Sequence, residues 1–172
     1  MNIPTYKFAL REDLKDDKRF LPTRAEPDAT GWDVRAAMHD KNALTVFSGQ
    51  YVKIPLGIRS FCPPGWWYEL KPRSSSFAKK GLHALYGTID QNFENELIFA
   101  AQYLPGMTQS DGKVEFYTNK LVIEFGEAIG QIIPVKRQEM LVEEVSNEEY
   151  DNLCKVRNGV RGIGGFGSTD RK

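Results

Sequence analysis

Short runs of alternating apolar and polar residues dominate the chain between Leu44 and Val135. In one such run, Leu121, Ile123 and Phe125 occupy every second position, the spacing of a strand with one buried face. Glycine and proline residues separate the runs at about the 8–12-residue spacing typical of β-sandwiches and barrels. The predicted strands are 44–47, 51–58, 66–71, 96–101, 114–118, 121–125 and 131–135. The pattern therefore predicts an all-β sandwich or barrel.

One segment near the C-terminal end has the pattern of a short surface helix. Ser146 followed by Glu149 forms a capping box, and the acidic first turn suits the positive end of the helix dipole. This helix is predicted up to about Lys155, and 77–83 is predicted as one further helical turn. We expect a single domain over residues 1–172, in which 158–172 forms a mobile, glycine-rich arm.

Composition and charge exclude several classes of protein. Lys+Arg and Asp+Glu both number 23, so no long-range field attracts nucleic acid or an anionic membrane. The first 20 residues mix charges of both signs, and the chain contains no apolar run of membrane-spanning length. We therefore expect a cytoplasmic protein, in the host cytoplasm if its source is a virus, with neither nucleic acid nor membrane as a partner.

The few cysteines and histidines point away from a zinc site and from a disulfide framework. Cys62 and Cys154 are the only cysteines, and His39 and His83 are the only histidines. They form no CxxC pair and no spacing typical of a zinc site. We expect both cysteines to be buried or idle thiols.

The segment RGIGGFGSTD, 161–170, combines four glycines with groups that bind anions. Successive glycines bring backbone N–H groups close to a ligand, and Arg161, Ser168 and Thr169 add side-chain donors. Phe166 offers a ring that stacks on a base. Two interpretations are open from this segment alone, a clamp that closes on a nucleotide and a flexible tail.

Two further clusters carry candidate chemistry. In PRSSS, 72–76, Arg73 and three serines place several hydrogen-bond donors at one turn. This turn is either a phosphate-binding site or an ordinary polar turn. In GTIDQNFEN, 87–95, Asp90 follows a short apolar run and is either a general base or a turn-former. GWD, 31–33, and GEAIGQ, 126–131, with Gln131 in an apolar strand, are weak signals alone.

Taken in order, these stretches resemble the five ordered motifs of the trimeric dUTPase family. The matching segments are ATGWDV (29–34), PRSSS (72–76), GTIDQNFEN (87–95), GEAIGQ (126–131) and RGIGGFGST (161–169). The resemblance implies a jelly-roll-like fold, a homotrimer with sites at subunit interfaces, and Mg²⁺-assisted hydrolysis of dUTP to dUMP and pyrophosphate.

The resemblance also implies a role for each matching residue. Asp90 activates the attacking water, and Phe93 replaces the tyrosine that packs on the deoxyribose. Arg73, Ser74 and Gln131 contact the phosphates, and Asp33 lies near the triphosphate and metal. The remaining substrate-binding residues are Ser75, Gly87, Ile89, Arg161, Phe166, Gly167, Ser168 and Thr169.

Departures from the family motifs leave functions other than dUTP hydrolysis open. Asn92, Asn95, Ala128 and Asp170 depart from the family motifs, and the chain is longer than usual near 103–118 and 143–157. These insertions are either surface decoration or contacts to a protein partner. The alternatives are a dCTP deaminase of the same fold, which the 161–169 arm argues against, and a dUTPase-like regulatory binding protein.

Overall fold

The computed structural model describes residues 3–105, 107–110, 113–116 and 119–157, and the chain divides into two compact units, 1–137 and 138–172. The strands of the first unit are β1 (Lys7–Leu10), β2 (Trp32–Arg35), β3 (Leu44–Phe47), β4 (Tyr51–Pro55), β5 (Ile58–Phe61), β6 (Trp66–Pro72), β7 (Leu82–Ala84), β8 (Gly87–Ile89), β9 (Ile98–Tyr103), β10 (Met107–Ser110), β11 (Lys113–Phe116), β12 (Lys120–Ile123) and β13 (Ala128–Lys136). The unit also contains helix α1 (Ser74–Ala78) and 3-10 turns at Glu12–Leu14 and Lys18–Phe20.

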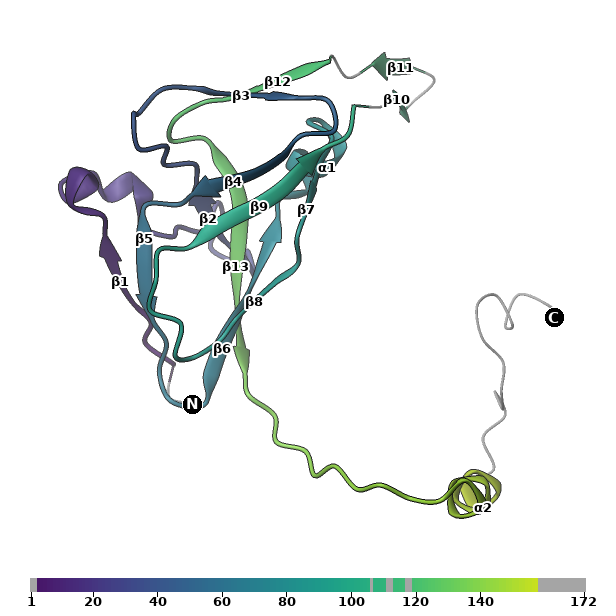
Figure 1. The fold of residues 1–172 in the computed structure, drawn as a ribbon. Coiled ribbons are helices and arrows are strands. Elements are labelled where there is room, and N and C mark those ends of the chain that lie inside the picture. Colours follow the sequence, from purple (N-terminus) through teal and green to yellow (C-terminus); the bar gives the residue numbers. More distant parts are fainter. Residues whose placement is uncertain (1–2, 106, 111–112, 117–118, 158–172) are drawn as a thin grey trace. The chain divides into compact units, whose positions relative to one another are not determined.

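All strand pairs in the described residues are antiparallel (Figure 1). The largest sheet has four strands in the order β2-β13-β6-β8, and a second sheet has the order β4-β9-β7. The remaining strands form the pairs β1-β5, β3-β12 and β10-β11. The prediction of a mostly β protein is confirmed.

Residues from both larger sheets form one hydrophobic core. Val34 and Leu70 from the four-stranded sheet are buried in the same cluster as Ile54 and Phe99 from the three-stranded sheet. In β4 the side chains of Val52 and Ile54 are buried and those between them are exposed, as a half-buried strand requires. The alternation in the sequence therefore marks the face that packs in the core.

The structure corrects the predicted elements at several places, and it adds the short strands β7, β8 and β10 to those predicted. The predicted strand 51–58 splits into β4 and β5, because Gly57 adopts a φ of 68°, a left-handed conformation that ends the first strand. Helix α1 begins at Ser74, and most of the predicted turn 77–83 lies outside it, since β7 begins at Leu82. Strands β1 and β2 lie before residue 44, outside the predicted β region.

The second unit contains helix α2 (Asn147–Arg157), which matches the predicted surface helix and extends two residues beyond Lys155. The Ser146 Oγ accepts the Glu149 backbone N–H at 3.1 Å, as the capping box predicts. Among the described residues, neither helix has the length and hydropathy needed to span a bilayer.

The two cysteines have different environments. Cys62 is buried, and this burial raises the pKa of its thiol to about 11, so it is an unreactive core residue. Cys154 is a free thiol exposed on α2, so of the two cysteines expected to be buried or idle, Cys62 is the buried one.

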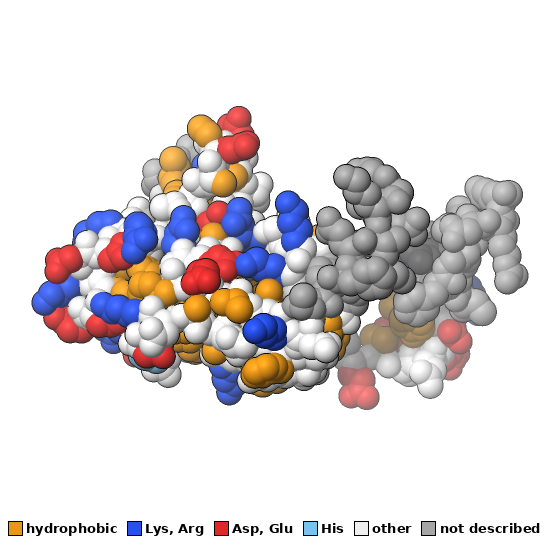
Figure 2. Space-filling model, turned by 90° about the horizontal axis from the view of Figure 1, so that it is seen from above, with side chains coloured by type: hydrophobic (Ala, Val, Ile, Leu, Met, Phe, Trp, Pro, Cys, Tyr) orange, Lys and Arg blue, Asp and Glu red, His pale blue; other side chains and the backbone are white. Residues whose placement is uncertain are grey.

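Charges of both signs are mixed over the face shown in Figure 2, where lysine and arginine side chains lie among aspartate and glutamate. This distribution agrees with the equal numbers of basic and acidic residues in the chain. Any strong anion site on this face must therefore be built locally rather than by a basic stripe.

Candidate active site

Three of the predicted motifs meet on one face of the four-stranded sheet. Gln131 of β13 lies directly between Asp33 of β2 and Lys71 of β6 in the strand register. Directly paired residues lie on the same face of a sheet, and so do residues two positions apart along one strand. Arg73, two positions after Lys71, is therefore expected on this face. The Arg73 Nε lies 3.2 Å from the Asp33 Oδ1, which confirms this juxtaposition.

A β-bulge in β13 anchors the serine-rich turn to this face. The register shifts between Ala128 and Gly130, which leaves Ile129 as the extra residue. The Ile129 carbonyl accepts the Arg73 backbone N–H at 3.3 Å and the Ser76 hydroxyl at 2.7 Å. Since Ser76 is buried, these two bonds fix the start of α1 against the bulge.

Charge pairs hold the edges of the same region. The Lys80 ammonium bonds the Glu127 carboxylate just before the bulge, where both side chains are half-buried. Lys71 pairs with Glu69 at 2.6 Å, and the Arg73 Nη1 lies 3.5 Å from the Ala128 carbonyl. Arg73 therefore contacts a carboxylate and the backbone of the bulge while its side chain stays 35% exposed.

The donors of this face suit an anionic ligand. Arg73 presents a guanidinium fork, and Gln131 presents a carboxamide whose Nε2 lies 3.4 Å from the Pro72 carbonyl. Ser74 is exposed and Ser75 is half-buried beside them at the start of α1. We call Asp33, Arg73, Ser74 and Gln131 the phosphate-side cluster.

Asp90 and Phe93 lie elsewhere, in the loop after β8. Both side chains are exposed, Phe93 by 37%, and the Phe93 N–H donates to the Asp90 carbonyl at 3.1 Å. Gly87 and Ile89, predicted to bind the substrate, pair with Leu70 and Tyr68 across β6. The residue before Asp90 therefore lies opposite Tyr68, near the start of β6.

Within a single chain, Asp90 lies far from the phosphate-side cluster. Ile89 pairs with Tyr68, so Asp90, the next residue, lies level with Trp67 near the start of β6. Arg73 comes directly after the other end of β6, six residues beyond Trp67. At about 3.3 Å per strand residue, the separation is roughly 20 Å. The predicted catalytic residues thus form two groups within a single chain.

The predicted arm residues Arg161, Phe166, Gly167, Ser168 and Thr169 lie outside the described residues. Among the residues that the structure does describe, no group of three or more His, Cys, Asp or Glu side chains is placed to hold a metal ion. In the phosphate-side cluster, Asp33 supplies a carboxylate, and Arg73 already pairs with it.

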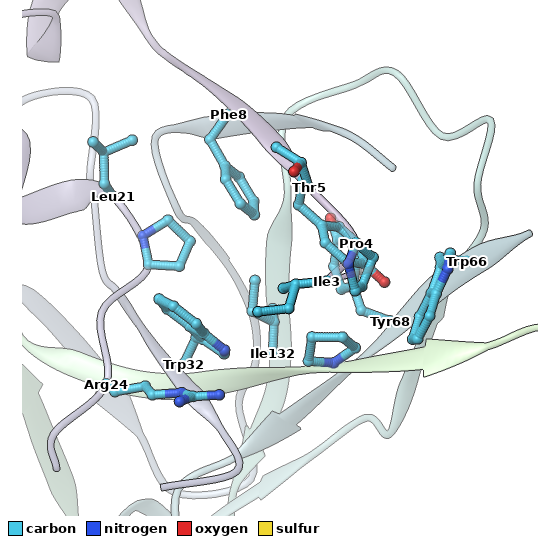
Figure 3. Close-up of a pocket in the computed structure, with 13 residues that line it drawn as sticks. Ile3, Pro4, Thr5, Phe8, Leu21, Arg24, Trp32, Trp66, Tyr68 and Ile132 are labelled. Carbon is cyan, nitrogen blue, oxygen red and sulfur yellow. The ribbon is translucent and has the colours of Figure 1, made fainter. Parts of the chain in front are cut away.

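A separate apolar groove of about 720 Å³ lies on the first unit, and sequence reasoning missed it (Figure 3). Its lining includes Trp32, Trp66, Tyr68 and Ile132, with the Arg24 guanidinium 4.7 Å from the centre of the Trp32 ring. The residues come from five parts of the chain, so no local pattern in the sequence signals the groove.

Comparison with known proteins identifies the family. No protein-family profile matches the chain. The chain is 31% identical over 159 residues to the deoxyuridine 5'-triphosphate nucleotidohydrolase of Bartonella bacilliformis, covering 88% of this chain and 83% of that protein. The chain belongs to the dUTPase family. The dUTPase of Maricaulis maris is 27% identical over 154 residues, covering 88% of each protein.

Solved structures of phage dUTPases share the fold. A variant of the Staphylococcus bacteriophage 80alpha dUTPase with dUpNHpp matches with a TM-score of 0.72 at 20% identity, over 96% of this chain and 98% of that one. Another structure of the 80alpha dUTPase, with a TM-score of 0.70, 20% identity and coverage of 95% and 97%, is described as showing that phage dUTPases control transfer of virulence genes. A dUTPase variant from phage phi11 of S. aureus matches with a TM-score of 0.65 at 18% identity, over 83% of this chain and 97% of that one, and is described with a structural Mg(II) ion.

Proposed function

We propose that this dUTPase-family protein hydrolyses dUTP to dUMP and pyrophosphate by attack of a water on the α-phosphorus. The observation that carries the proposal is the 31% identity to a deoxyuridine 5'-triphosphate nucleotidohydrolase over most of both chains. The meeting of Asp33, Arg73 and Gln131 on one sheet face supports it, because a triphosphate needs several converging donors.

Each cluster of residues takes one part of the reaction. The phosphate-side cluster binds the triphosphate, with Arg73 and Gln131 on phosphate oxygens and Ser74 near the oxygen that leaves with pyrophosphate. Asp90 takes a proton from the attacking water, and an exposed carboxylate beside Phe93 is available for this role. Phe93 packs on the deoxyribose and the backbone from Gly87 to Ile89 reads the base, with Ser75 completing the binding residues.

We propose that Mg²⁺ binds together with dUTP, through the triphosphate and water. Asp33 is the acidic member of the phosphate-side cluster, and oxygen donors such as its carboxylate are the ligands that Mg²⁺ prefers. An ion bound in this way would supply positive charge next to the phosphates. Asp33 would contribute to holding it through water.

The separation of Asp90 from Arg73 supports a site shared between copies of the chain, and we propose a homotrimer. If about 20 Å separates the two groups in one chain, an Asp90 from a neighbouring copy completes the site. The second unit offers a surface for such an assembly, since Met140 and Val142 are 83% and 86% exposed and Leu141 is fully exposed. Three consecutive exposed aliphatic side chains suit an apolar groove such as the one lined by Trp32 and Trp66 on another copy.

Replacing Leu141 with Glu should therefore shift the protein from trimer to monomer. A charge at this position cannot enter an apolar groove without a large desolvation cost. Light scattering after size-exclusion chromatography measures the mass directly. Val156→Glu on α2, at another highly exposed aliphatic position, serves as the control and should stay trimeric. A trimeric Leu141→Glu protein would contradict this interface.

Removing residues 161–172 should leave a folded trimer with greatly reduced turnover. In our proposal Arg161, Ser168 and Thr169 hold the terminal phosphate while Phe166 stacks over uracil next to Gly167, so the deletion removes charge stabilisation and water exclusion together. Turnover of dUTP and mass by light scattering are the two measurements. An unchanged rate would show that the segment is a tail.

The test of the proposed function is pyrophosphate release from dUTP, dCTP, dTTP and UTP with Mg²⁺, with ammonia measured in parallel. Pyrophosphate from dUTP alone is the expected result, because Phe93 packs where a 2'-hydroxyl would project. Ammonia from dCTP would assign the protein to deaminases of the same fold. No product from any of the four would favour a regulatory binding protein.

A second role as a regulatory binding protein has one structural observation in its favour. The β10–β11 hairpin, in the insertion near 103–118, pairs with no other strand among the described residues. The 80alpha dUTPase, which shares the fold, is described as controlling transfer of virulence genes. We propose that this hairpin and the 143–157 segment contact a protein partner without taking part in hydrolysis.

A further inference from the structure

Gly31 packs directly against the side chain of Gln131. A Cβ at position 31 would lie 2.0 Å from the Gln131 Oε1 and 2.8 Å from its Cδ, far inside van der Waals contact. Gly31 precedes β2 by one residue, and Asp33, two positions on, is paired with Gln131 in the register. The Gln131 carboxamide therefore extends along β2 and covers the position that a side chain at residue 31 would fill.

The backbone conformation does not explain a glycine at this position. Five described glycines adopt a positive φ, and Gly31 is not among them. Because its φ lies outside the left-handed region, an alanine there meets no backbone strain. A glycine is instead needed at position 31 because the Gln131 side chain occupies the space that a Cβ would fill.

Gln131 also connects Gly31 to the second motif. Its Nε2 lies within 3.4 Å of the Pro72 carbonyl, directly before Arg73. The carboxamide thus lies between Gly31, the residue just before β2, and Pro72, the last residue of β6. Displacing it would move a donor of the phosphate-side cluster and break its link to the Arg73 turn.

We propose that Gly31 is a positioning residue that sets the orientation of the Gln131 carboxamide toward the substrate phosphates. The proposal deepens the function proposed above and rests on it for the role of Gln131. Gly31 touches no substrate and acts through Gln131 alone. Any side chain at position 31 rotates the carboxamide away from its place.

A double-mutant cycle tests this role. Gly31→Ala should lower kcat/KM for dUTP by about 10- to 100-fold, the cost typical of a misplaced substrate-binding group. In a Gln131→Ala background the same change should cost only a few-fold, because the Oε1 and Cδ that clash with the new methyl are gone and only the Cβ of residue 131, at 3.2 Å, remains close to it. Thr30→Ala, at the exposed neighbouring position, is the control for a local backbone effect and should keep wild-type activity.

A spectroscopic readout separates this inference from the proposed function. The Gln131 side-chain amide resonances, identified by their loss in Gln131→Ala, should shift in the ¹H–¹⁵N spectrum of Gly31→Ala and not in that of Thr30→Ala. This result is expected whether or not the wild-type protein hydrolyses dUTP. Unmoved resonances would overturn the inference, and so would equal losses of kcat/KM in the two backgrounds.

Folding of the variants gives a further outcome. If Gly31→Ala fails to fold and the Gly31→Ala/Gln131→Ala protein folds, the clash with Gln131 is the cause and the inference holds. Failure of both proteins to fold would show that Gly31 has a structural role independent of Gln131. Thermal unfolding of all four members of the cycle measures this directly.

Discussion

Replacing Asp90 with Asn should lower kcat for dUTP by about 10²- to 10⁴-fold, the contribution typical of a positioned general base. The amide keeps the shape of the side chain and its capacity to bond the sugar, but it cannot take a proton from water. Nucleotide affinity should therefore stay close to that of the wild type. Single-turnover kinetics and calorimetric binding of a non-hydrolysable dUTP analogue measure the two quantities separately.

Glu94 provides the matched control for this substitution. It is another exposed carboxylate in the same loop and has no place in the proposed site. Glu94→Gln should leave kcat unchanged, which excludes a general effect of removing negative charge from the loop. Full activity in the Asp90→Asn protein would remove Asp90 as the base.

Replacing Arg73 with Ala should lower kcat/KM by about 10²- to 10³-fold, the loss typical for one stabilising donor in an active site. Arg73 is the guanidinium of the phosphate-side cluster, and its removal also leaves the Asp33 carboxylate without its partner at 3.2 Å. Repulsion between Asp33 and the triphosphate then adds to the lost attraction.

Two further variants give this prediction its specificity. Arg73→Lys should fall between wild type and Arg73→Ala, because lysine keeps the charge without the two-pronged geometry. Arg59→Ala removes an exposed arginine from β5, away from the cluster, and should keep full activity. Equal rates for Arg73→Ala and wild type would exclude Arg73 from the site.

The strands with regular alternation were predictable from the sequence because one face of each packs in the core. The predicted 44–47 coincides with β3, and 66–71 differs from β6 by one residue. Helix α2 was predictable for a different reason, since Ser146 and Glu149 form a local cap. Both signals are contained within a few residues.

The geometry of the site depends on the pairing of strands that are far apart in the sequence. Local sequence patterns therefore could not predict it. No local pattern indicates that Gln131 pairs with both Asp33 and Lys71, or that a bulge at Ile129 receives Arg73 and Ser76. The resemblance to the family placed these residues in one site, but it did not reveal that Gly31 accommodates Gln131. Such contacts follow from packing and have no sequence signature.

The central claim of this account is that Asp90 of one copy completes a phosphate-side cluster on another. The most direct test combines Asp90→Asn and Arg73→Ala chains, co-expressed with different affinity tags so that only mixed trimers are purified. In a cyclic trimer of either composition, one site in three pairs an intact Asp90 with an intact Arg73 from a neighbour. We therefore predict recovery to about a third of wild-type activity, well above either parent. Mixed trimers as inactive as the parents would contradict a shared site and place Asp90 and Arg73 in the same chain's site.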